Sequence, residues 1–241
     1  STQSRSSAAS DVYKRQKLPR LKALGTAIIV NVAGATRKDY VEVVQRLTDE
    51  DGVDAFEINI SCPNVKEGGI EFGTRPRAAA GLIALLRART RRAMIVKLSP
   101  NVTDVVKIAR AVADAGADAL SLVNTFRGMA IDVETARPAL GNVCGGLSGP
   151  AIRPLAVYHV FRVSSCVKLP VIGMGGITSA RDALEFIFAG ASAVSVGTAN
   201  LARPTASVEV LEGLEAWCAA RGVHSIAELV GRAHAGKPGV G

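Results

Sequence analysis

Six short apolar runs, separated by longer segments with helical spacing, constrain the fold of this chain more than any other feature of its sequence. The runs are continuous rather than alternating, which is typical of strands that are buried on both faces. Thr103 and Ser179 stand where helix N-caps are expected, and Gly116 and Gly190 stand where helices should end. Strand and helix in alternation predict a parallel α/β sheet. The predicted strands cover residues 27–34, 55–61, 93–100, 119–125, 170–176 and 193–199.

An internal repeat supports this interpretation. The stretches "GVDAFEIN" (52–59), "GADALSLV" (116–123) and "GASAVSVG" (190–197) share a helix-ending glycine, a small or acidic turn residue, and an alanine that leads into an apolar run. The shared pattern indicates one repeating βα unit. Six units are visible, whereas a (β/α)8 TIM barrel needs eight. The pattern alone therefore fits either an open doubly wound sheet or a barrel with two units missing upstream.

Polar residues and glycines at the carboxyl ends of the runs favour the barrel. In parallel barrels, this end of the strands carries the active site. A single asparagine or glycine could simply end a strand, but the whole set needs a further explanation. The residues concerned are Asn31, Asn59, Lys97, Asn124 with Thr125, Gly175 with Gly176, and Gly197 with Thr198.

Two of these strand ends indicate a phosphorylated ligand. Gly175–Gly176 and Gly197–Thr198 offer accessible backbone N–H groups, and a short helix start after either pair could bind a phosphate through its dipole. The segment "GMGGIT" (173–178) lacks the third glycine of the dinucleotide fingerprint, which argues against a Rossmann site. Lys97 lies in an otherwise apolar strand, so its ammonium should face an anion or an electron-rich cofactor atom.

Cys62 is the candidate residue for chemistry. Pro63 ends the strand directly behind it, and Asn59, Ser61 and Asn64 supply hydrogen-bonding groups within a few residues. All three histidines lie in the second half of the chain, so a protease-like cysteine–histidine pair is not indicated. These surroundings favour a nucleophile or a base, whereas the other cysteines fit small hydrophobic residues better.

Composition and charge exclude several classes of protein. Of the net charge of +8, +5 falls on residues 1–22, and the aromatic residues, 4% of the chain, do not alternate with basic ones, so nucleic-acid binding is not expected. The scattered cysteines show no metal-ligand spacing. No apolar run is long enough to cross a bilayer and no signal-peptide pattern opens the chain, so we expect a cytoplasmic protein without membrane association. The Ser-rich residues 1–16 are expected to be a tail outside the fold.

Five stretches together resemble the catalytic subunits of class 1B dihydroorotate dehydrogenases in order and spacing. They are "NISCPNVKEGGIEFGT" (59–74), "VKLSPNVTD" (96–104), "LVNTFRGMAIDVETARPAL" (122–140), "GGLSGPAIRPLAV" (145–157) and "IGMGGITSARDALEFIFAGASAVSVGTA" (172–199). The resemblance implies an FMN-containing (β/α)8 barrel. It also implies an oxidoreductase that converts (S)-dihydroorotate to orotate in de novo pyrimidine (UMP) biosynthesis.

The resemblance further implies roles for individual residues. Cys62 would be the base that removes the C5 proton of dihydroorotate while a hydride leaves C6 for FMN. Lys97 would lie beside N1 and O2 of the flavin, where a positive charge stabilises the reduced ring. The other implied contacts are Asn31, Asn59, Val123 and Gly149 for the isoalloxazine and ribityl groups, Gly175, Gly176, Gly197 and Thr198 for the phosphate, and Asn59, Asn64, Asn124 and Thr125 for the pyrimidine.

Members of this family begin with two further βα units that contribute flavin and substrate contacts. Residues 17–241 are therefore expected to form an FMN-binding barrel domain that contains about six of the eight units. The resemblance also implies that electrons pass to NAD+ through a partner subunit that carries FAD and a [2Fe-2S] cluster, arranged around a homodimer of catalytic subunits as a heterotetramer. The four cysteines of this chain lack the spacing needed to bind that cluster.

The sequence leaves two alternatives open. The related dihydropyrimidine dehydrogenase barrel shares a Ser-Cys-Pro loop and an Asn-Thr strand end, although residues 64–66 and the short loop fit dihydroorotate better. Orotate should bind in one case and uracil in the other. The second alternative is an inactive fragment of a barrel, and it loses weight because Cys62, Lys97 and the phosphate-binding glycines are all retained.

Overall fold

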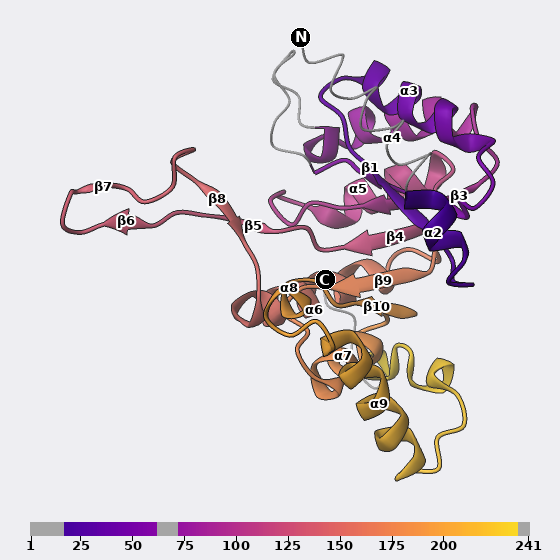
Figure 1. The fold of residues 1–241 in the computed structure, drawn as a ribbon, viewed down its shortest axis with the longest axis vertical. Coiled ribbons are helices and arrows are strands. Elements are labelled where there is room, and N and C mark those ends of the chain that lie inside the picture. The colour runs from indigo at the N-terminus through magenta and orange to yellow at the C-terminus, as the bar shows by residue number, and fades with distance from the viewer. Residues whose placement is uncertain (1–16, 62–71, 236–241) are drawn as a thin grey trace. The chain divides into compact units, whose positions relative to one another are not determined.

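The computed structural model describes residues 17–61 and 72–235, and all six predicted strands are present in it (Figure 1). Their order in the sheet is β1-β2-β3-β4-β9-β10, and the registers of β1 with β2, β4 with β9 and β9 with β10 are parallel. This alternation of parallel strands and helices fits a partial (β/α)8 barrel, as the sequence predicted. The strands are β1 (Ile29–Val32), β2 (Ala55–Asn59), β3 (Ala93–Lys97), β4 (Ala119–Leu122), β9 (Val171–Met174) and β10 (Ala193–Ser195).

Helices follow the strands, and their ends test the predicted caps. Ser179 is the N-cap of α7, as expected, but the predicted N-cap at Thr103 is wrong by one residue. The carboxylate of Asp104 accepts hydrogen bonds from the N–H groups of Val106 and Lys107 at 3.1 and 3.4 Å, so it caps α5. The α-helices are α2 (Leu18–Lys22), α3 (Arg37–Thr48), α4 (Pro76–Arg87), α5 (Val105–Asp114), α6 (Arg153–Ser164), α7 (Ala180–Phe188), α8 (Thr198–Ala202) and α9 (Ala206–Ala219), and the 3-10 turns are η2 (Phe72–Thr74), η3 (Pro150–Ile152), η4 (Ile226–Leu229) and η5 (Arg232–His234).

The three repeated stretches adopt the same local structure. Their glycines, Gly52, Gly116 and Gly190, have φ angles of 94°, 103° and 110°, a conformation that L-residues rarely adopt. Two residues later, each backbone N–H donates to a carbonyl of the neighbouring strand segment, at 2.8–3.0 Å. In the first two stretches an aspartate follows the glycine at this position, and its carboxylate also accepts an N–H from that segment, at 2.7 Å. The repeat therefore sets how each helix leads into its next strand.

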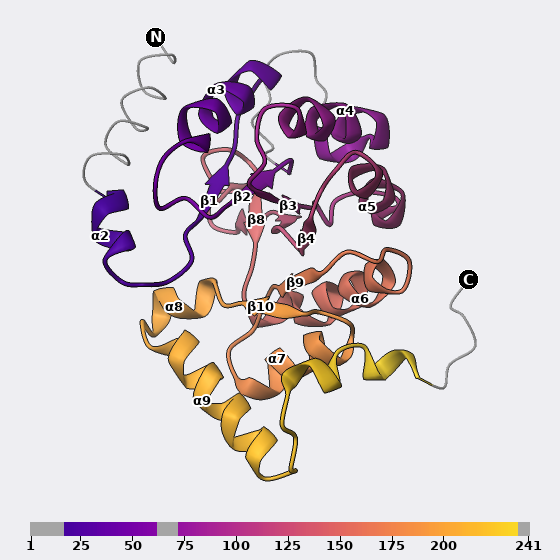
Figure 2. The ribbon, with the colours of Figure 1, turned by 90° about the vertical axis from the view of Figure 1, so that its right-hand side faces the viewer.

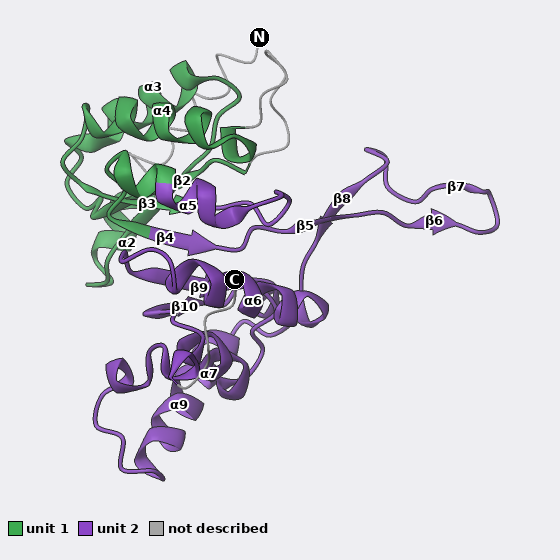
Figure 3. Cartoon of the chain, turned by 180° about the vertical axis from the view of Figure 1, so that it is seen from behind, with its two compact units in different colours: residues 1–96, 111–119 green, residues 97–110, 120–241 purple. Residues whose placement is uncertain are grey.

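The chain divides into two compact units (Figure 3). Unit 1 comprises residues 1–96 and 111–119, and its core lies between β1–β3 and the helices α3 and α4, which cover one side of β1 and β2 (Figures 1 and 2). Tyr40, Phe56, Leu82 and Leu86 are fully buried there. Burial of such large apolar side chains supplies most of the driving force for folding.

Unit 2 comprises residues 97–110 and 120–241 and carries the C-terminal helices. Leu184 and Ile187 of α7 form a buried cluster with Leu229, against which Leu214 and Trp217 of α9 pack. Between β4 and α6 the chain forms an arm that no predicted strand covered (Figure 1). The arm consists of β5 (Phe126–Gly128) paired antiparallel with β8 (Gly145–Leu147), and β6 (Ile131–Asp132) paired with β7 (Arg137–Pro138).

Among the residues that the structure describes, no helix is long and apolar enough to span a membrane. The predicted tail, residues 1–16, lies outside the described residues, so the division at residue 17 stays a prediction.

Candidate active site

The carboxyl end of β4 brings three of the predicted site residues onto one short segment of unit 2. The N–H of Val123 donates to the Met174 carbonyl at 3.0 Å, and the N–H of Asn124 donates to the Leu98 carbonyl at 3.2 Å. These bonds tie residues 123 and 124 to the ends of β9 and β3, where a barrel places its reactive groups. The Asn124 carboxamide oxygen accepts the Thr125 N–H at 2.9 Å, which fixes its orientation. The peptide bond between Leu122 and Val123 is cis.

Asn101 holds this segment in place and was missed by the sequence analysis. Its carboxamide nitrogen donates to the Thr125 carbonyl and its oxygen accepts the Arg127 N–H, both at 2.9 Å. A side chain that bonds both an N–H and a carbonyl of one segment fixes the path of that segment. Gly146 of the arm lies so close to Thr125 that a Cβ there would be 2.7 Å from the threonine Cβ. The sequence signal was the "SPN" that follows the apolar run of β3.

Two glycine turns of unit 2 pack directly against each other. Gly149, Gly175 and Gly176 have φ angles of 89°, 127° and 78°, which favour glycine. A Cβ on Gly176 would lie 2.7 Å from the Gly149 carbonyl oxygen and 2.9 Å from Cβ of Arg153. Only glycine therefore fits at this point, and the turn after β9 lies against the turn that precedes α6.

The second predicted phosphate segment, residues 197–198, lies beside the turn at Gly149. The Thr198 hydroxyl donates to the Ser148 hydroxyl at 3.0 Å, which joins the start of α8 to the residue before Gly149. Gly197 and Thr198 are exposed, and a Cβ on Gly197 would meet no atom within 4 Å. The structure thus brings the two predicted phosphate segments, residues 175–176 and 197–198, next to residues 148–149, of which Gly149 was predicted to contact the isoalloxazine or ribityl group.

The start of α7 is already occupied by its own cap. Asp182 accepts the N–H groups of Thr178 and Ser179 at 2.9 Å each, and its own N–H donates to the Ser179 hydroxyl at 3.3 Å. The sequence predicted that a helix start after Gly176 could bind a phosphate, but the N–H groups of Thr178 and Ser179 at this start already donate to Asp182.

The predicted asparagines of unit 1 have well-defined partners. Asn31, on β1, donates through its side-chain amide to the Glu57 carboxylate, which lies opposite it in the register of β1 and β2. The Asn59 side-chain oxygen accepts the Ser61 N–H at 3.1 Å, and the buried Tyr40 hydroxyl donates to the Asn59 carbonyl at 2.7 Å. These bonds orient the end of β2, a few residues before Cys62.

Lys97 is the last residue of β3, is half-buried, and belongs to unit 2 together with residues 123–125. Cys62 and Asn64 lie outside the described residues. The described cysteines, Cys144, Cys166 and Cys218, are free thiols, and within residues 17–61 and 72–235 no cluster of three or more potential ligands could hold a metal ion.

Two cavities contain none of the predicted site residues. One of about 710 Å³ in unit 1 is lined by residues before β3 and after α3, and its Arg92 donates to the carbonyls of Thr48 and Glu50 at 2.6 and 3.0 Å. The other, of about 290 Å³ in unit 2, lies between the start of α5 and the α6 residues Tyr158, His159 and Arg162. Burial, followed by the charge of Arg162, lowers the pKa of His159, so its ring is neutral at physiological pH.

Comparison with known proteins decides the family. Residues 6–217 match the family model described as dihydroorotate dehydrogenase. The chain belongs to the dihydroorotate dehydrogenase family. Similar curated proteins include those of Trichlorobacter lovleyi, 55% identical, and Pelobacter propionicus, 54% identical, each over 92% of this chain and 73% of its own length. The protein of Desulforudis audaxviator is 56% identical over 91% of this chain and 72% of its own length. All three are named dihydroorotate dehydrogenase B (NAD(+)), catalytic subunit. Enzymes of this family are flavin-dependent oxidoreductases.

Proposed function

We propose that this chain is the catalytic subunit of an NAD+-linked enzyme that oxidises (S)-dihydroorotate to orotate in pyrimidine biosynthesis, with FMN as its flavin. The observation that carries the proposal is the convergence of three glycine-containing segments, residues 148–149, 175–176 and 197–198, within the unit that also holds Lys97, Asn124 and Thr125. The high identity to relatives named for this activity supports it.

The residues present fit a flavin mononucleotide. The backbone of Gly176 packs against the Gly149 carbonyl, the space where Gly197 would carry a Cβ is open, and the hydroxyls of Ser148 and Thr198 adjoin these turns. Backbone N–H groups of glycine turns and threonine hydroxyls are donors suited to a phosphate monoester. Val123, Gly149 and Asn31 would contact the isoalloxazine and ribityl groups. Bound FMN would supply a two-electron acceptor for the hydride that leaves C6.

The chain's own residues would perform the acid–base part of the reaction. The Cys62 thiolate would take the proton from C5, so that loss of this proton and of the C6 hydride forms the C5=C6 double bond of orotate. Asn124 and Thr125, held by Asn101, would bind the pyrimidine ring together with Asn59 and Asn64. These amides and hydroxyls can both donate to and accept from the ring carbonyl and N–H groups.

We further propose that electrons leave through a second subunit that carries FAD and a [2Fe-2S] cluster, around a homodimer of this chain in the cytoplasm. The word "subunit" in the relatives' names supports an assembly of this kind. The proposed reaction needs such an acceptor because each turnover leaves two electrons on the flavin.

A reduction experiment without oxygen tests the proposed function directly. The purified chain is loaded with FMN, dihydroorotate is added, and flavin absorbance is followed. We expect bleaching with dihydroorotate, inhibition by orotate, and no bleaching with dihydrouracil. Bleaching by dihydrouracil instead would support the dihydropyrimidine dehydrogenase alternative, and FMN binding without reduction by either compound would support the inactive alternative.

Replacement of Lys97 tests whether its side chain contributes to FMN binding. We expect Lys97→Ala to weaken FMN binding by about 1.5–3 kcal/mol, roughly tenfold to a hundredfold, because a charged hydrogen-bond partner would be lost. Titration by flavin fluorescence measures this affinity. Lys107→Ala is the matched control, since Lys107 is an exposed lysine that pairs with Asp104 at 3.6 Å and should contribute little. Equal FMN affinity in the two variants would remove Lys97 from the site.

A further inference from the structure

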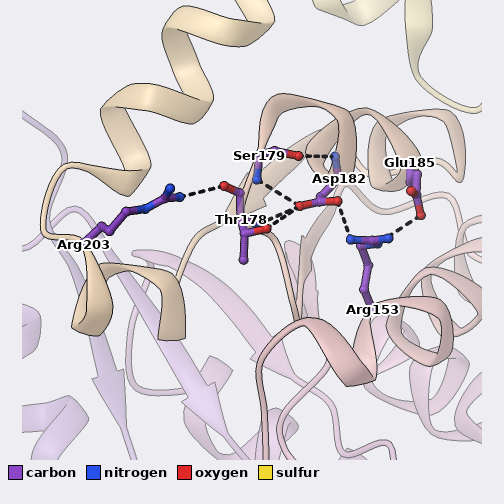
Figure 4. Close-up of polar contacts among 6 residues, drawn as sticks. All are labelled: Arg153, Thr178, Ser179, Asp182, Glu185 and Arg203. Carbon is purple, nitrogen blue, oxygen red and sulfur yellow. Dashed lines mark hydrogen bonds and ion pairs between the residues drawn. The ribbon is translucent and has the colours of Figure 1, made fainter.

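A buried carboxylate organises the loop between β9 and α7 (Figure 4). One oxygen of Asp182 accepts hydrogen bonds from the Thr178 N–H at 2.9 Å, the Thr178 hydroxyl at 2.8 Å and the Ser179 N–H at 2.9 Å. Its other oxygen accepts a charge-assisted hydrogen bond from the Arg153 guanidinium. Asp182 is only 7% exposed, so each of these partners is needed to offset the loss of water.

Two arginines extend this arrangement to neighbouring segments. Arg153, in the first turn of α6, bonds Asp182, and its Nε lies 3.4 Å from the Glu185 carboxylate. Arg203, directly after α8, donates to the Thr178 carbonyl at 3.0 Å. The loop at Thr178–Asp182 is therefore joined on one side to the start of α6 and on the other to the end of α8, as Figure 4 shows.

Arg153, Thr178 and Arg203 each lie close in the chain to one of the three glycine-containing segments. Arg153 follows Gly149 by four residues, and its Cβ would contact a Cβ on Gly176. Thr178 follows Gly176 by two residues, and Arg203 follows Thr198 by five. The side-chain network thus joins residues that lie two to five positions after each of the three segments.

A second capping box in the same chain shows which contacts of Asp182 go beyond an ordinary helix cap. At the start of α3, Asp39 accepts the Ala35 and Thr36 N–H groups at 2.9 and 2.8 Å and donates its own N–H to the Thr36 hydroxyl at 3.3 Å. The local geometry matches that at α7, but within the part of the chain that the structure describes, the carboxylate of Asp39 bonds only to residues 35–36. The cap alone therefore explains the bonds to Thr178 and Ser179, but not the ion pair with Arg153.

The carboxylate is held in its charged form. Burial opposes ionisation of Asp182, but the hydrogen bonds from Thr178 and Ser179 and the charge of Arg153 outweigh burial and hold its pKa below the ordinary carboxyl range. The connection between the loop and α6 is therefore an ion pair throughout the neutral pH range.

We infer that Asp182 is a positioning residue. Together with Arg153 and Arg203 it sets the spacing of the three glycine-containing segments, and in this way it determines the preference of this chain for a phosphorylated flavin. The inference rests on the proposed function, because it needs the flavin phosphate to lie at these segments. Asp182 does not touch the phosphate itself. It acts by fixing the backbone that does.

The test compares FMN with riboflavin, which lacks the phosphate. We expect Asp182→Asn to weaken FMN binding by on the order of tenfold or more, as loss of an outer-shell partner does elsewhere, and to leave riboflavin binding unchanged. Both dissociation constants are measured by flavin fluorescence on the full chain. The matched control is Asp39→Asn, which removes an equivalent cap and should keep the wild-type ratio of the two constants. A purely structural role would weaken both ligands together.

A second variant covers the case in which Asp182→Asn does not fold. Arg203 is exposed, and Arg203→Met keeps the apolar stem of the side chain while it removes the hydrogen bond to Thr178. We therefore expect a change in the ratio of the FMN and riboflavin dissociation constants in the same direction as for Asp182→Asn, but smaller. A wild-type ratio in the folded variants overturns the inference and leaves the proposed function standing. A wild-type chain that binds riboflavin as tightly as FMN overturns the phosphate site of the proposed function as well.

Discussion

We expect the Cys62→Ser variant to bind FMN normally and to be reduced by dihydroorotate about 10²–10⁴-fold more slowly than the wild-type chain. A thiol ionises with a pKa of about 8.5, whereas a serine hydroxyl is not ionised at accessible pH, so the variant would lack a base of matched strength. Rapid-mixing measurement of flavin bleaching without oxygen gives the rate of this step alone. In the wild-type chain, the rate should rise with pH as the thiolate fraction grows.

Cys166→Ser is the control for this experiment. Cys166 is an exposed free thiol beyond the end of α6, and its replacement should change neither FMN binding nor reduction. Wild-type reduction kinetics in Cys62→Ser would exclude Cys62 as the base. Loss of FMN from this variant would instead indicate a structural role for Cys62.

The strands could be predicted because burial on both faces leaves a clear signal. Continuous β-branched and aliphatic runs identified all six strands of the parallel sheet, and positive-φ glycines such as Gly116 and Gly190 marked the helix ends. The arm at residues 126–147 left no such signal, because its strands are two or three residues long and largely exposed. Short exposed strands depend on their partners and not on a buried face.

The site could be predicted only in part, and for a different reason. Parallel topology places the carboxyl ends of the strands on one edge, so Asn124, Gly176 and Thr198 were predicted from their position alone, and their contact with a ligand stays a prediction. Asn101 and Asp182 could not, because their role depends on hydrogen bonds to other segments. The "SARD" motif (179–182) did contain a capping-box signature, Ser-x-x-Asp. Its ion pair with Arg153 joins residues 29 positions apart and has no local pattern.

Gly176→Ala should strongly destabilise unit 2. The new Cβ would lie 2.7 Å from the Gly149 carbonyl and 2.9 Å from Cβ of Arg153, and the residue would keep a φ of 78°. Left-handed backbone costs an L-residue about 1–2 kcal/mol. Steric crowding in a packed region adds about 1–3 kcal/mol. We therefore expect the free energy of unfolding to fall by about 2–5 kcal/mol, with loss of FMN retention, because the two turns must separate.

Gly222→Ala separates the cost of the left-handed backbone from the cost of steric crowding. Gly222 has a similar φ of 64°, but a Cβ there would meet no atom within 4 Å, so only the backbone term of about 1–2 kcal/mol applies. Thermal unfolding and FMN titration of both variants distinguish the contributions, since Gly222→Ala should retain the flavin. Equal destabilisation of the two variants would mean that the turn at 175–176 can move away from Gly149 at no cost. The close approach of these two turns would then not be what holds the phosphate side of the site together, and the flavin would have to depend on residues 197–198 instead.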